Sequence, residues 1–353
     1  MSKITILSPT ADAHPTSPLA VVKVQFSDVT TDQAELRVND ARHYVHLEDT
    51  SGFFQENITL LKGKNVISAQ IGKLSHRVEI TLPPSQNITI RTPGPRTRSI
   101  KTRAYRIKGD YSQMSCPAGV ISVNGRMQQL PLEGSKGRFS EKITLLPGCN
   151  HIAIQIGQYY ATKKVQGVFP KAKVAITLSW DSTKTMDLGI IEPRTNGGIS
   201  GITTEWCRYE GLPNKLFISR RVGFGPQTYT GGIRKKMVPG RYEVSVKLYS
   251  PKLVRRTEWT AIAIVDEAEP QQRKYYFYGI FDARNGRWDA PYSTPPHLPS
   301  GLWNDICTFT VAPDSWLTPG PPGSVGRDSS TGNLCFESAS VALRPRNGTV
   351  TFV

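Results

Sequence analysis

Apolar and polar residues alternate along most of the chain. Segments 19–26 and 174–180 carry apolar residues at every second position, as expected for a strand with one buried face. Turn signals such as Asn124-Gly125 separate the alternating segments. No segment keeps a 3.6-residue period over ten residues. The pattern therefore predicts an all-β protein.

One stretch of this pattern occurs twice. Residues 58–72 read ITLLKGKNVISAQIG, and residues 143–157 read ITLLPGCNHIAIQIG, 85 positions later without a gap. We interpret each copy as a β-hairpin in which a glycine such as Gly63 supplies a left-handed turn position. Phe54 and Phe139 recur at the same spacing. The duplication predicts two consecutive β-sandwich modules of one kind.

The pattern predicts three sandwiches, in residues 1–84, 85–170 and 171–282. Residues 283–353 differ, because they are rich in Pro, Gly and Ser and hold three of the six tryptophans. About seventy loop-rich residues bury little core alone, so we expect them to pack on the third sandwich as an extension.

Charge is distributed unevenly over these parts. Residues 1–87 carry 8 Lys and Arg against 9 Asp and Glu, whereas residues 88–172 carry 14 against 3. The second module therefore holds most of the formal net charge of +16. An excess of this size attracts polyanions or acidic protein faces. A solubilising charge without a partner is the alternative.

The chain contains neither a run of 18 apolar residues nor a signal-peptide core near its start. We predict no membrane span. The start of the chain is consistent with synthesis and use without export, or with a leader that was removed.

Five cysteines are present, without a CxxC pair, so a structural zinc site is not expected. Cys116 and Cys149 both belong to the second module, and the first module has neither. Their joint appearance suggests a disulfide inside that module.

The repeat unit, a strand ending in VN or VNG, then a Phe and ITLLxGxNxIxxQIG, resembles bacterial Ig-like modules. Such modules lie beside catalytic domains in secreted glucan-degrading enzymes and proteases, where they act as spacers or adhesion units. The resemblance covers about residues 1–170 and implies Ig-like β-sandwiches with no activity of their own.

The third module resembles the YfaP-type bacterial domain of uncharacterised function. LSWDSTKTMDLGIIEP at 178–193, GFGPQTYT at 223–230 and VPGRYEVSVKLYS at 238–250 carry this resemblance. The sequence departs from the family because its DLD pair is reduced to Asp187 and its GPE triplet reads Gly225-Pro226-Gln227. Asp181, Asp187 and Glu192 form a weak Ca²⁺ candidate, since calcium prefers several oxygen ligands. Ordinary turn and edge carboxylates are the alternative.

Two sets of residues are candidates for a protein interface. The first is a basic stretch, six cations in thirteen residues without an acid: Arg96, Arg98, Lys101, Arg103, Arg106 and Lys108. On extended chain it would follow an acidic protein face or a polyanion, or it is a solvated loop. The second set is Trp303 and Trp316, which would anchor a partner, stack on sugars or cover the sandwich end.

No GxSxG, HExxH or Walker motif occurs, and we predict no catalytic residues, no metal and no cofactor. We expect a non-enzymatic structural or adhesive protein that contacts protein subunits of a larger assembly. A virion component of a tailed bacteriophage, such as a neck, tail or decoration protein made in the host cytoplasm, fits best. The alternative is a secreted or periplasmic multi-domain protein that binds carbohydrate, a polyanionic surface or another surface.

Overall fold

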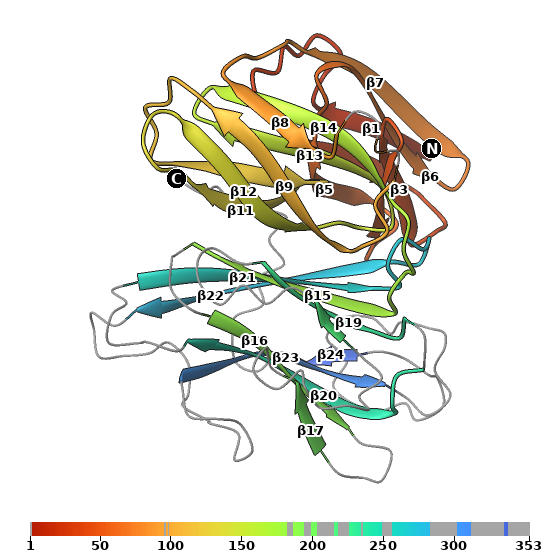
Figure 1. Ribbon diagram of the computed structural model, residues 1–353. Helices are drawn as coiled ribbons and strands as arrows, with labels where there is room; N and C mark the ends of the chain where they lie inside the picture. Colours follow the sequence, from red (N-terminus) through yellow and green to blue (C-terminus); the bar gives the residue numbers. More distant parts are fainter. Residues whose placement is uncertain are drawn as a thin grey trace. The chain divides into compact units, whose positions relative to one another are not determined.

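The structure, a computed structural model, shows three pairs of β-sheets (Figure 1). This arrangement confirms the predicted all-β class and its consecutive β-sandwiches. The residues it describes are 2–94, 97, 99–181, 186–193, 199–202, 215–217, 226–233, 236–248, 256–282, 302–311 and 335–337. These residues contain no helix long and apolar enough to cross a membrane.

The contacts divide the chain into two compact units. The first unit holds the described residues that lie within Met1–Lys171 and Ile264–Lys274. The second holds Ala172–Ala263 and the described residues from Tyr275 on. The first unit therefore contains both repeated modules, together with the short segment 264–274.

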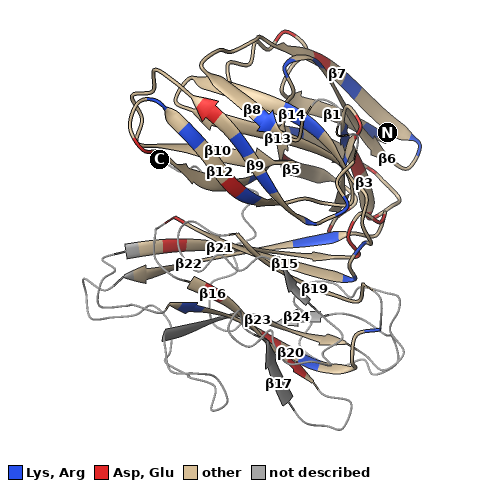
Figure 2. Cartoon of the chain, viewed as in Figure 1, with Lys and Arg blue, Asp and Glu red and all other residues tan. Residues whose placement is uncertain are grey.

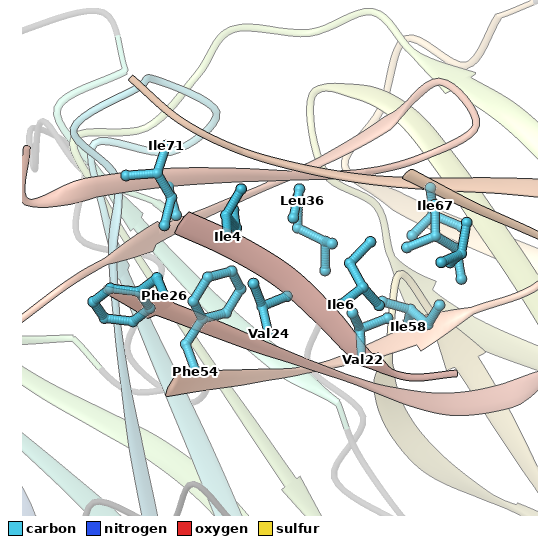
Figure 3. Close-up of a cluster of buried hydrophobic side chains, with 14 of the residues drawn as sticks. Ile4, Ile6, Val22, Val24, Phe26, Leu36, Phe54, Ile58, Ile67 and Ile71 are labelled. Atoms are coloured by element: carbon cyan, nitrogen blue, oxygen red, sulfur yellow. The ribbon is translucent and has the colours of Figure 1, made fainter. Parts of the chain in front are cut away.

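The first module pairs a sheet of order β1-β2-β5 with a sheet of order β4-β3-β6-β7. Its strands are β1 (Lys3–Ser8), β2 (Leu19–Ser27), β3 (Gln33–Val38), β4 (Ala41–His46), β5 (Gly52–Thr59), β6 (Gly63–Ile71) and β7 (Leu74–Leu82). In most of these strands every second residue points into the core, as Val22, Val24 and Phe26 of β2 do (Figure 3). The predicted alternation is therefore the inward face of each strand.

The second module repeats this topology strand for strand. Sheet β8-β9-β12 matches β1-β2-β5, and sheet β11-β10-β13-β14 matches β4-β3-β6-β7. Its strands are β8 (Ile88–Thr92), β9 (Ala104–Tyr111), β10 (Ala118–Val123), β11 (Arg126–Pro131), β12 (Gly137–Thr144), β13 (Gly148–Ile156) and β14 (Tyr159–Gly167). Asn124 and Gly125 both have positive φ and join β10 to β11, so the predicted Asn-Gly turn is confirmed and closes a β-hairpin.

The repeated stretch itself is not a hairpin, and this expectation was wrong. β5 pairs with β2, whereas β6 pairs with β3 and β7, so residues 58–72 cross from one sheet to the other. Leu60, fully buried, lies at the crossing point. A turn containing glycine can close a hairpin within one sheet or connect strands of two different sheets. The alternating pattern does not encode which strand is the partner, so the sequence did not distinguish the two.

The recurring asparagine of the stretch holds this crossing together. Leu61 N–H donates to Asn65 Oδ1 at 2.8 Å, and Asn65 Nδ2 donates to Leu61 O at 2.7 Å. Asn150 makes the same two bonds with Leu146, both at 2.8 Å. Both asparagines are fully buried. Gly63 and Gly148, two residues earlier, have φ of 89° and 91°, which explains the LLxGxN pattern.

The third sandwich pairs sheet β18-β19-β15-β21-β22 with sheet β17-β16-β20-β23-β24. Its strands are β15 (Val174–Trp180), β16 (Met186–Pro193), β17 (Ile199–Ile202), β18 (Lys215–Phe217), β19 (Gln227–Gly231), β20 (Gly240–Leu248), β21 (Arg256–Val265), β22 (Arg273–Asp282), β23 (Leu302–Val311) and β24 (Cys335–Glu337). Tyr242 and Phe309 stack between β20 and β23 with ring centroids 4.7 Å apart. Strands that follow residue 283 therefore extend a sheet of this sandwich.

Candidate functional site

Cations gather on the outer face of sheet β8-β9-β12 in the second module. We define the basic face as Arg91 of β8, Arg106 and Lys108 of β9, and Arg138 and Lys142 of β12. Ile107, Phe139 and Ile143 alternate with them and point into the core. The outward residues are therefore placed on one face by the strand period of two. Figure 2 shows the blue positions along β9 and β12.

Strand register brings these cations close together. Lys142 lies directly opposite Arg106, and Ser140 lies opposite Lys108. Arg106 Nη1 donates to Ser140 O at 3.1 Å, which fixes its guanidinium across the strands. Like charges directly opposite each other on a sheet are destabilising. This part of the face therefore concentrates positive charge at some cost to the fold.

One acid lies on the basic face. Asp110 of β9 pairs with Arg91 and lies 3.6 Å from Arg138 Nε. Lys108 and Lys142 form no ion pair or side-chain hydrogen bond within the described part of the chain. The single carboxylate orients two guanidinium groups and leaves the other cations uncompensated.

The predicted basic stretch divides into different environments. Lys101, Arg106 and Lys108 are exposed, and the last two lie on β9 rather than in a loop. Arg103 is 4% exposed and faces inward. Arg96 and Arg98 lie outside the described residues. Their role as interface residues stays a prediction.

Arg103 forms a buried ion pair within the first unit. Its Nη2 donates to Glu267 Oε2 at 2.6 Å, and its Nη1 also pairs with Glu267, whose side chain is fully buried. The guanidinium lies 5.0 Å from the centroid of the Phe169 ring. The planar guanidinium presents two parallel N–H donors, which suits a bidentate contact with a carboxylate. These contacts make Arg103 part of the internal structure of the unit, because both of its Nη groups and one face of the guanidinium are occupied.

The two repeated modules contact each other through buried polar groups, and we call this contact the junction. Thr59 Oγ1 of β5 lies 2.8 Å from Ser122 Oγ of β10, and Gly125 N–H donates to Thr59 Oγ1 at 2.8 Å. A Cβ added to Gly125 would lie 1.8 Å from Asn57 O. Tyr160 of β14 packs within the core of the first module. The modules therefore share a close-packed junction.

A histidine of this junction is held in its neutral form. Nδ1 of His151 lies 3.2 Å from Thr59 O and donates to it, and Nε2 has no partner among the described residues. Burial lowers the pKa of His151 to about 4. The unpaired ring nitrogen is consistent with that shift, because nothing there stabilises a second proton.

Glu56 is a second buried titratable group of the first unit. Lys274 Nζ donates to Glu56 Oε2 at 2.9 Å, and His43 Nδ1 lies 3.8 Å from the same oxygen. Burial lowers the pKa of His43, although its contact with Glu56 opposes this. Burial alone would raise the pKa of Glu56, but Lys274 and His43 hold it below the usual value. The carboxylate therefore stays charged in a buried, paired site.

The predicted disulfide between Cys116 and Cys149 is wrong, since both thiols are free. A Cβ on Gly157 would lie 3.1 Å from Cys116 Sγ, which places Cys116 beside the end of β13. Cys149 lies at the start of β13, eight residues earlier, or about 25 Å along an extended strand. A disulfide joins Cα atoms only about 4–7 Å apart.

The structure does not bring the calcium candidates together. Asp181 Oδ1 accepts from Glu258 N–H at 2.8 Å, and Glu192 Oε1 accepts from Tyr229 OH at 2.6 Å. Asp187 and Glu192 lie five residues apart on β16, about 17 Å along the strand. No group of three His, Cys, Asp or Glu side chains able to hold a metal occurs in the part of the chain that is described.

Of the two tryptophan candidates, Trp303 lies on β23, with its backbone opposite Lys247 of β20. Trp316 lies outside the described residues. Both stay predictions as partner anchors.

Sequence reasoning missed Arg91, Arg138 and Lys142. They lie outside the run of cations and join Arg106 and Lys108 only through antiparallel pairing. Part of the signal was available in β12, where Arg138, Ser140 and Lys142 alternate with Phe139, Glu141 and Ile143, although Glu141 is itself polar.

Comparisons with known proteins add little beyond the fold. No protein-family model matches the chain, and no curated protein matches it. Fibronectin(III)-like modules of Clostridium thermocellum CbhA are 13% identical over 47% of this chain and 93% of theirs, with a TM-score of 0.18. A titin tandem is 10% identical over 68% of this chain and 94% of its own, also with a TM-score of 0.18.

Domains 1–6 of the surface layer protein SbsC are 13% identical over 78% of this chain and 40% of that chain, with a TM-score of 0.18. TM-scores this low carry no argument about function. The chain contains tandem Ig-like β-sandwiches, as its own sheet topology shows. The YfaP-type resemblance of the third module stays a prediction.

Proposed function

We propose that this protein is a non-enzymatic structural or adhesive component that makes protein–protein contacts within a larger assembly. The interlocked junction of the two repeated modules supports this proposal most directly. Buried hydrogen bonds and the close backbone approach at Gly125 join the two modules as one body, rather than as two domains on a flexible linker. A rigid body of this kind suits a protein that holds other subunits at a fixed spacing.

The assembly that we propose is the particle of a tailed bacteriophage, with the chain as a neck, tail or decoration protein. The basic face supports this choice, because a charged sheet surface suits docking on a neighbouring subunit. The first module, with the same topology, has a different outer face, so the charge is not a requirement of the scaffold.

Quantitative mass spectrometry of purified particles tests the proposal. We expect peptides of this chain at a fixed ratio to the major capsid or tail protein, unchanged by a high-salt wash and a second density gradient. Absence from the particles, or a ratio that falls with each purification step, would exclude a virion role.

The competing candidate is a secreted or periplasmic protein that binds carbohydrate or another surface. Phe53, on the outer face of the first module, favours it, because the ring is 52% exposed and Lys23 Nζ lies 4.4 Å from its centroid. Glycan-array binding that Phe53→Ala abolishes would support this candidate. Unchanged binding in the variant, or no glycan bound, would leave the assembly role as the better proposal.

A further inference from the structure

We propose that the basic face binds the acidic surface of a partner protein through that partner's carboxylates. The proposal rests on the assembly role above and names the chemistry of one contact. The cations form a two-dimensional patch: Arg106 and Lys142 face each other across β9 and β12, and Lys108 follows Arg106 at the next outward position.

The patch has unused binding capacity. Within the described residues, the ammonium groups of Lys108 and Lys142 have no counter-ion. The Nη1 atom of Arg106 bonds to Ser140 O at 3.1 Å, which orients the guanidinium and leaves its Nη2 group free to bind a carboxylate. Placing Lys142 opposite Arg106 costs stability in the free protein, and a bound carboxylate between them removes this repulsion.

The first module shows that the scaffold does not need these charges. The register of β2 and β5 matches that of β9 and β12 residue for residue. The residues that correspond to Arg106, Lys108, Arg138 and Lys142 are Val21, Lys23, Phe53 and Asn57. One cation therefore occupies the positions that hold four in the second module.

The lack of an exposed aromatic ring favours protein carboxylates over a single nucleic-acid strand. The aromatic residues of β9, Tyr105 and Tyr111, lie at inward positions and pack with the core. The face as described therefore offers no ring on which an exposed base could stack.

Binding of poly-L-glutamate and of single-stranded DNA by the full chain tests this proposal. Both probes carry a fluorophore and are titrated at equal charge concentration by anisotropy, at low and at physiological salt. We expect poly-L-glutamate to bind more tightly than DNA and to weaken as salt rises. The double variant Arg106→Glu/Lys142→Glu should lower its affinity about tenfold or more, because it reverses two charges of the patch.

Lys108→Glu and Lys23→Glu form a matched pair, since each reverses one charge and Lys23 is the counterpart of Lys108 in the first module. We expect Lys108→Glu to lower the affinity, whereas Lys23→Glu should change it less than about twofold. A second variant, Arg106→Gln/Lys142→Gln, guards against an effect of the introduced acids on folding, and its circular dichroism should match that of the unchanged protein.

Five results would overturn the proposal: no binding of poly-L-glutamate, binding that salt does not weaken, unchanged affinity in Arg106→Glu/Lys142→Glu, an equal loss in Lys23→Glu, or tighter binding of DNA. None of these results bears on whether the chain is present in particles. The mass-spectrometric measurement decides that question separately, so the two proposals can fail independently.

Discussion

At the scale of single residues, His151 combines complete burial with a ring nitrogen that has no partner among the described residues. Its pKa falls from 6.5 to about 4 on folding, so the unfolded chain binds its proton more tightly. The contribution of His151 to stability is present above pH 6.5. It is lost as the pH falls from 6.5 towards 4, by roughly 3 kcal/mol at most.

Chemical unfolding at pH 7 and pH 4.5 measures this contribution. We expect the free energy of unfolding to fall less between these pH values in His151→Gln than in the unchanged protein, since glutamine does not titrate. His14→Gln is the control, because His14 is exposed. An equal fall in all three proteins would show that His151 is not responsible.

At the scale of elements, the turn between β10 and β11 depends on a glycine. Gly125 has φ of 78°, and a side chain there would meet Asn57 O across the junction. We expect Gly125→Ala to lower the free energy of unfolding by roughly 4 kcal/mol, from backbone strain together with the displaced junction. Urea denaturation of the full chain measures the change.

Gly63→Ala isolates the strain alone. Gly63 has φ of 89°, but its added Cβ would have nothing within 4 Å. The expected cost is therefore about 1–2 kcal/mol. Equal losses in the two variants would mean that the contact with Asn57 contributes little.

The pairing of β9 with β12 predicts a substitution that raises the free energy of unfolding rather than lowering it. Lys142→Gln removes a like charge opposite Arg106, so we expect stability to rise by about 0.2–1 kcal/mol at low salt, with a smaller gain at high salt. Thermal unfolding at two salt concentrations measures it. Lys23→Gln should give no gain, because Lys23 lies opposite Gln55. A loss of stability in Lys142→Gln would contradict the assigned repulsion.

The strands of the two repeated modules show what the sequence could predict. Alternation and the 85-residue repeat predicted the strands and the duplication, because both are local patterns that repeat in register. They did not predict that β5 and β6 belong to different sheets, since pairing depends on partners far along the chain. The basic stretch pointed to Arg106 and Lys108, while Arg138 and Lys142 joined them only through that long-range pairing.

At the scale of the whole first unit, the modules differ from independent domains because a residue of the second module packs in the core of the first. Tyr160 belongs to β14 of the second module, yet its side chain packs with the first module's core, and its OH donates to Pro83 O at 2.5 Å. Val165, on the same strand, packs only with the second core. A shared residue couples the unfolding of both sandwiches.

We therefore expect Tyr160→Ala to lower hydrogen-exchange protection in β2 and β6 of the first module as well as in β13 and β14. Loss of a large buried aromatic side chain should cost about 3–5 kcal/mol. Val165→Ala, the control, should lower protection mainly in the second module. Protection lost from the second module alone in Tyr160→Ala would mean that the sandwiches unfold separately, and that the junction does not make them one mechanical body.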